Sequence, residues 1–256
     1  MYKRFVLGVL SGLVVAALAG SAGAAVLSSG YSIFNNAATL GGFSGSVVYA
    51  AGIKASQNNT VNGVLFTAVG SGGDMLNPIT YATSVTGNAW VYSGGSWLPA
   101  PQTPTFGSTS DDDALEKLCE NGLMDNPGHP ELAMAVTPGT TYTLSLIFPG
   151  QFTYNNGSGL TQVDIAFEGA TLINDLNVWA LTGGETGANY GQGLRFDVQF
   201  TAEDTVAKID VLGADGADRC PALSAFVLTE GVIPEPASLT LAALAFGGLL
   251  LRRRPA

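Results

Sequence analysis

Positive charge is scarce in this 256-residue chain. Lysine and arginine together number 10 against 20 aspartates and glutamates, which gives a formal net charge of −10 at pH 7. Five of the ten basic residues but only one acid, Glu235, lie in the two terminal segments, so the body between them is near −14. An acidic surface of this kind repels nucleic acid and anionic lipid. The composition therefore excludes nucleic-acid binding.

Residues that could catalyse hydrolysis are also few. His129 is the only histidine, so a Ser-His-Asp arrangement has a single candidate base. No Gly-x-Ser-x-Gly elbow is present, and the nearest approach, at 42–46, has serine where the second glycine belongs. No pair of carboxylates is marked by its context as a glycosidase pair. We expect no enzyme activity and no catalytic residue, and a secreted hydrolase is the least favoured alternative.

Cysteine occurs only twice, at Cys119 and Cys220. In an oxidising compartment an isolated pair of this kind is most simply one disulfide. Closing a loop of about 100 residues would stabilise the fold by roughly 4.7 kcal/mol in the chain-entropy model. We predict a Cys119–Cys220 disulfide.

The first 24 residues have the composition of a signal peptide. Lys3 and Arg4 precede an uncharged apolar run over 5–20, and Ala22, Gly23 and Ala24 supply the small residues of a cleavage site. Cleavage after Ala24 would make Ala25 the first residue of the exported chain.

The last residues have three parts in a fixed order. Pro234, Glu235 and Pro236 precede a fifteen-residue apolar run at 237–251, and Arg252, Arg253 and Arg254 follow it. As a helix the run would be about 22 Å long, shorter than a bilayer core of about 30 Å. The segment is therefore suited to transient membrane insertion, with its arginines on the cytoplasmic side. The alternative is a plain C-terminal membrane anchor.

This tail resembles the PEP-CTERM sorting signal of exported proteins in Gram-negative bacteria. The resemblance rests on the Pro-Glu-Pro motif, the apolar helix and the terminal arginines. It implies recognition by a membrane-embedded exosortase, removal of the tail, and delivery to the cell envelope, surface or extracellular matrix. Signal peptidase and exosortase are the partners that the two ends predict. The chain would then divide into 1–24, a body at 25–232, and a sorting signal at 233–256.

The body is dominated by alternation of apolar and polar residues, which is typical of antiparallel strands with one face on a core. The alternation predicts an all-β sandwich. Aspartates 111–113, followed by Leu115, Leu118 and Cys119, predict one short helix near 111–121, capped by Ser110 or an early aspartate. Strands are expected at 60–66, 140–148, 163–167, 194–200, 205–212 and 222–228.

The order of these segments also resembles the jelly-roll domains of galactose-binding-like and malectin-like type. Strand and turn residues from Asn62 to Leu228 carry this looser resemblance. Many such domains bind carbohydrate, which makes an extracellular polysaccharide the candidate ligand. For stacking on sugar rings the sequence offers Trp97, Trp179 and Tyr190, although Trp179 also suits a core position beside Val178.

Calcium is the metal that acid-rich loops favour, because hard cations take oxygen ligands. Asp111 and Asp113 form one weak candidate, and Asp215 and Asp218 form the other. A helix N-terminus and a turn are the preferred explanations of these clusters, and no cofactor is expected.

The sequence thus predicts an exported surface or matrix protein with a structural or adhesive role. The alternative is a carbohydrate-binding module.

Overall fold

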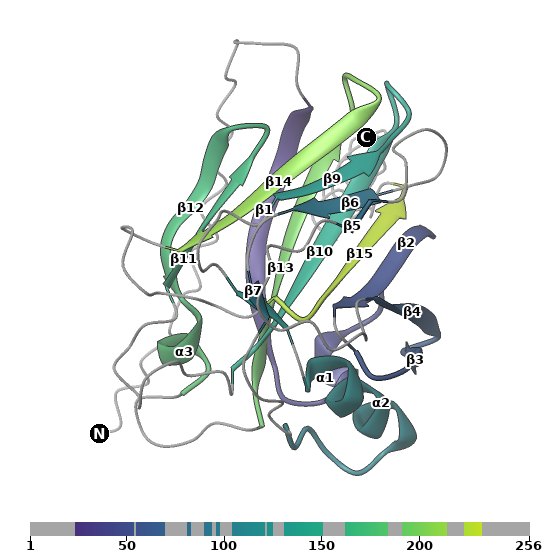
Figure 1. Ribbon diagram of the computed structural model, residues 1–256, viewed down its shortest axis with the longest axis vertical. Helices are drawn as coiled ribbons and strands as arrows, with labels where there is room; N and C mark the ends of the chain where they lie inside the picture. Colours follow the sequence, from purple (N-terminus) through teal and green to yellow (C-terminus); the bar gives the residue numbers. More distant parts are fainter. Residues whose placement is uncertain are drawn as a thin grey trace, which may run out of the picture.

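The computed structural model describes residues 24–53, 55–69, 81–82, 90–93, 96–97, 104–120, 122–124, 131–150, 162–183, 191–213 and 223–231. Two sheets lie face to face (Figure 1). In spatial order the first contains β1 (Ala25–Phe34), β13 (Gly193–Thr201), β10 (Thr141–Pro149), β15 (Ala225–Glu230), β2 (Ser46–Ile53), β4 (Val64–Val69) and β3 (Asn59–Val61). The second contains β12 (Ala170–Asn177), β11 (Gln162–Phe167), β14 (Val206–Gly213), β9 (Glu131–Ala135), β6 (Trp90–Ser93) and β5 (Tyr81–Ala82). A separate pair joins β7 (Ser96–Trp97) to β8 (Leu123–Met124).

Eight of these strands form a jelly roll. Strands β2, β9, β10 and β11 pair antiparallel with β15, β14, β13 and β12, respectively. The pairing runs from the outer ends of the series inward, which is the result of folding one long hairpin over itself. The predicted antiparallel sandwich of jelly-roll type is therefore confirmed. β1 lies outside this set, beside β13, and β4 adds a parallel pair with β2.

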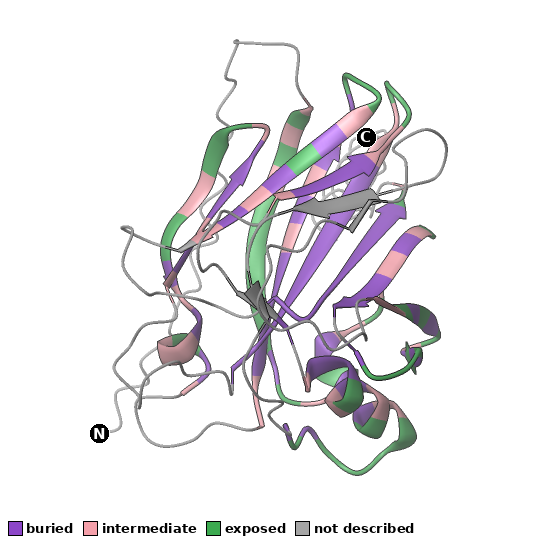
Figure 2. Ribbon diagram, viewed as in Figure 1, coloured by how far each residue is buried: buried purple, intermediate pink, exposed green. Residues whose placement is uncertain are grey.

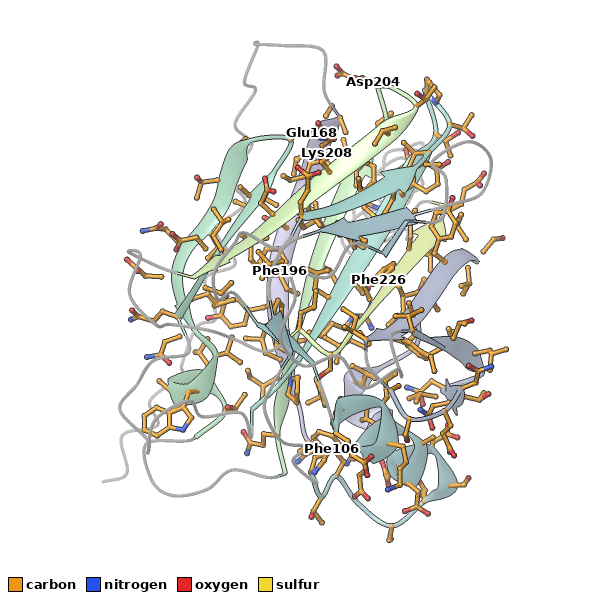
Figure 3. The ribbon with its side chains drawn as sticks, in the orientation of Figure 1. Phe106, Glu168, Phe196, Asp204, Lys208 and Phe226 are labelled. Carbon is orange, nitrogen blue, oxygen red and sulfur yellow. The ribbon has the colours of Figure 1, made fainter. Side chains whose placement is uncertain are left out.

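The space between the sheets is filled by the inward faces of alternating strands. Phe148, Phe167, Phe196 and Phe226 are essentially inaccessible to solvent there. Figure 3 shows Phe196 and Phe226 near the middle of the molecule. Burying a large apolar side chain stabilises the fold by about 1.5–3 kcal/mol, so these rings anchor the two layers.

A second core covers the outer face of the first sheet. The helices α1 (Ala37–Leu40) and α2 (Ser110–Cys119) lie there beside β3 and β4 (Figure 1). They bury Leu40, Leu115 and Leu118 against Ile147 and Val227. The strands β10 and β15 are consequently buried on both faces, which period-two alternation alone does not indicate.

Most predicted strands are confirmed within a few residues, but the strand predicted at 60–66 is wrong. The chain turns at Asn62 and Gly63, whose φ angles are 49° and 78°. These left-handed values suit an Asn-Gly hairpin turn, and the segment forms two short strands, β3 and β4, instead of one.

The predicted helix is confirmed as α2, with its apolar face buried as expected. The predicted cap at Ser110 or an aspartate is wrong by at least one residue. Thr109 is the N-cap: its hydroxyl accepts a hydrogen bond from the Asp112 N–H, and the Asp112 carboxylate accepts one from the Thr109 N–H. This reciprocal arrangement is a capping box.

Among the described residues, no helix is long and apolar enough to cross a membrane. The predicted apolar helix at 237–251 lies outside those residues, as do the Pro-Glu-Pro motif, the terminal arginines and Ala22. β1 begins at Ala25, the residue predicted to follow the signal peptide. The cleavage site and the domain boundaries stay predictions.

Candidate functional site

An open polar hollow of about 530 Å³ lies between α2 and the turn that precedes β3. Its walls carry amide, hydroxyl, carboxylate and ammonium groups. The residues that line it are Gln57, Asn58, Asn59, Thr60, Ser110, Asp113, Ala114, Glu116 and Lys117.

Local hydrogen bonds fix the turn that forms one wall. The Asn59 side-chain amide donates to the Gln57 carbonyl at 2.8 Å, and the Asn58 side chain accepts from the Ala68 N–H at 2.8 Å. Asparagine side chains commonly close turns by bonding nearby backbone groups in this way. The wall is thus tied directly to β4.

The opposite wall is the exposed face of α2. Asp113 points away from the buried face, Glu116 accepts a hydrogen bond from the Phe106 N–H at 2.9 Å, and Lys117 forms an ion pair with Glu120. Two carboxylates and one ammonium therefore line this side of the hollow.

α2 is held in place by the buried carboxylate of Asp112. Its Oδ1 accepts from the Ala37 N–H at 2.8 Å, and its Oδ2 accepts from the N–H groups of Ser108 and Thr109 at 3.1 and 3.0 Å. These donors, led by Ala37, hold the pKa of Asp112 below its ordinary value. The carboxylate joins α2 to the start of α1 and so fixes the position of the hollow.

The groups that line the hollow suit a polar, uncharged ligand rich in hydroxyls. Amides and carboxylates accept from hydroxyl groups, and amides, hydroxyls and the ammonium donate to them. Among the described residues that line the hollow there is no aromatic ring, so binding to them would depend on hydrogen bonds. Of the candidate residues from sequence, only Asp113 belongs to this site. The alternation pattern gave no signal for the other residues that line the hollow, because the turn at 57–59 and α2 are distant in the chain.

The residues predicted to stack on sugars are not brought together as one platform by the described part of the structure. Trp179 is half-buried in the short helix α3 (Val178–Leu181), next to the buried Val178. Trp97 belongs to β7, and Tyr190 lies outside the described residues.

Of the two calcium candidates that the structure describes, one has a structural hydrogen bond and the other lines the hollow. Asp111 accepts a hydrogen bond from the Asn62 N–H at 3.1 Å, and Asp113 faces the hollow. Asp215 and Asp218 lie outside the described residues. Within the described ranges, no group of three or more histidine, cysteine, aspartate or glutamate side chains is placed to hold a metal. Calcium binding stays a prediction.

Cys119 is fully buried at the end of α2, and burial raises the pKa of its thiol far above the ordinary value. Cys220 and His129 lie outside the described residues. The disulfide therefore stays a prediction.

A second polar cluster lies at the far end of the sandwich, where Figure 3 shows Glu168, Asp204 and Lys208 near one another. Glu168 exchanges two hydrogen bonds with the backbone of Lys208, at 2.7 and 3.0 Å. Burial, together with nearby aspartates, raises the pKa of Glu168. Glu168 and Gly169 form the β11–β12 turn with φ angles of 50° and 75°. Glu168 therefore extends the β11–β14 pairing into this turn. That structural role accounts for its two hydrogen bonds with the Lys208 backbone.

Comparison with solved structures finds partial matches to extracellular domains of plant receptors. The ANXUR2 extracellular domain from Arabidopsis thaliana is 14% identical over 72% of this chain and 41% of its own, with a TM-score of 0.48. The ANX2 ectodomain from Arabidopsis thaliana is 10% identical over 73% of this chain and 50% of its own, with a TM-score of 0.49. The chain thus spans half or less of the length of these structures. No family model and no curated protein matches the sequence.

Proposed function

We propose that this protein is exported to the cell surface or extracellular matrix, where it has a structural or adhesive role. The observation that carries the proposal is the pairing of a signal peptide at 1–24 with a Pro-Glu-Pro, apolar and triple-arginine tail at 233–256. Signal peptidase would act at the first segment and an exosortase at the second. Both segments would enter the membrane only transiently.

The body supports this assignment in two ways. The jelly roll has one core between its sheets and another over the outer face of the first sheet, an arrangement that suits a structural unit. Its acidic composition keeps copies soluble during export.

The tail is tested by analysing the protein recovered from the surface fraction. We expect mass spectrometry to find residues after about Pro236 missing, because the family signal is removed during sorting. A variant with Pro234→Ala, Glu235→Ala and Pro236→Ala should keep its tail and stay in the membrane fraction. Recovery of the intact Ala256 terminus from the wild-type surface fraction would contradict the proposal.

Carbohydrate binding is the second candidate, and the polar hollow beside α2 favours it. We expect the exported protein to bind hydroxyl-rich glycans on an array, with Asp113→Asn weakening binding about tenfold through loss of a charged hydrogen bond. Trp179→Ala is the parallel variant, since it removes the aromatic candidate and leaves the hollow intact. Loss with Asp113→Asn places the sugar in the hollow, and loss with Trp179→Ala places it at α3. A flat array would remove this candidate.

A further inference from the structure

β1 is the outermost strand of the seven-stranded sheet and, among the residues that the structure describes, pairs with β13 on one side only. The hydrogen-bonding groups on the other edge of such a strand are available to another extended strand. Natural proteins usually protect these edges with charge, proline, bulges, short length or a covering element.

The other three edges that the structure describes in the two sheets carry such protection. β3 is three residues long and packs against α2, and β5 has two residues. β12 pairs irregularly with β11, and its Asp175 has a left-handed φ of 54°. β1, in contrast, has ten residues without a charge or a proline. Its one bulge, between Val26 and Ser28, lies near the start of the strand, and the pairing from Ser28 to Phe34 is regular.

β1 also exposes apolar side chains on the inner face of its sheet. Tyr31 is paired with Phe196, and Ile33 is paired with Leu194, so each pair shares a face. Yet Tyr31 and Ile33 are 46% and 36% exposed, whereas Phe196 and Leu194 are 1% and 0% exposed. β1 therefore extends the first sheet one strand beyond the layer that covers it. Figure 2 shows β1 as a largely exposed strand.

We propose that β1 pairs antiparallel with β1 of a second copy of this chain, joining two sheets around a twofold axis. A second copy fits this edge because the strand is uncharged, so no like charges face each other when identical strands meet. Elsewhere the acidic bodies repel one another. The same contact places the Tyr31 and Ile33 strips of the two copies side by side, which removes both from water.

The size of the contact sets its strength. One ten-residue strand from each copy is smaller than the roughly 20–30 residues per side of a standard interface. The dimer is therefore weak and forms at high local concentration, as at a cell surface. This inference is independent of the sorting route, because it concerns the folded body in solution.

The test is analytical ultracentrifugation of the exported protein over a wide concentration range, with hydrogen exchange followed in parallel. We expect the average mass to approach about twice that of the monomer as concentration rises, while amide protection in 25–34 increases. The double variant Tyr31→Lys, Ile33→Lys should remain monomeric, because it places lysines on the edge. Leu65→Lys is the matched control: Leu65 is 58% exposed on β4, away from this edge.

Each outcome decides the matter. Wild-type protein that stays monomeric throughout, or a double variant that dimerises as wild type does, overturns the proposal. If the double variant does not fold, the wild-type exchange measurement decides alone. A dimer that forms without added protection in 25–34 uses another surface and overturns the proposal as well.

Discussion

Replacing Arg195 with methionine is expected to lower the free energy of unfolding by about 4 kcal/mol, because two backbone carbonyls, a hydroxyl and the 38% exposed Asp197 carboxylate lose their charged donor. Arg195 lies on the outer face of β13 and is buried. Its Nη1 donates to the carbonyls of Leu40 and Gly42 at 3.1 and 3.0 Å, and its Nε donates to Asp197 Oδ1 at 2.8 Å. Its Nη2 donates to the Ser145 hydroxyl at 3.2 Å. Methionine has a similar length but none of these donors.

The guanidinium also lies over the ring of Phe43, 4.7 Å from the ring centroid. Such a contact adds about 0.5–1 kcal/mol or more when it is shielded from water. Arg195 thus attaches the segment after α1 to the sheet.

Chemical denaturation of the wild type and variants measures this effect. Arg195→Lys should recover only part of the loss, because an ammonium cannot reach all four acceptors in the geometry of a guanidinium. Lys208→Met is the matched control: the exposed Lys208 ion pair with Glu131, at 3.4 Å, should be worth less than about 1 kcal/mol. Equal losses for Arg195→Met and Lys208→Met would show that the network contributes little.

Arg195 also has surroundings that its strand pattern does not predict. Alternation with Leu194 and Phe196 correctly predicts that Arg195 points away from the core between the sheets. It also predicts contact with solvent there, which is wrong, because Leu40 and Gly42 cover the side chain from about 150 positions away in the chain. A local pattern contains no information about such long-range cover.

Strands with clean alternation, such as β10 and β13, were predictable because one of their faces fills the central core. β1 and β2 were not predicted, since their small and polar residues give little contrast between faces. The hollow could not be predicted, because it depends on how α2 packs against β3. Only the acidic first turn of α2 pointed toward it, through Asp113.

The buried carboxylate of Asp112 leads to the second large effect. Asp112→Ala should lower the free energy of unfolding by about 3 kcal/mol, because three backbone N–H groups and a hydroxyl lose a charged acceptor. Asp113→Asn, in the same turn but exposed, should cost only about 0.5 kcal/mol through the helix dipole.

The pH dependence separates the charge of Asp112 from its shape. Its pKa in the folded state is lower than the ordinary value of about 3.9, so its contribution is fully present above that value. The contribution is lost as the pH falls through the folded-state pKa, because the unfolded chain then binds more protons than the folded one. Asp112→Asn keeps the size of the side chain but removes this titration. We therefore expect urea midpoints measured from pH 6 to pH 2 to fall less steeply for Asp112→Asn than for the wild type. Parallel curves would show that the negative charge of Asp112 adds nothing to its hydrogen bonds and packing.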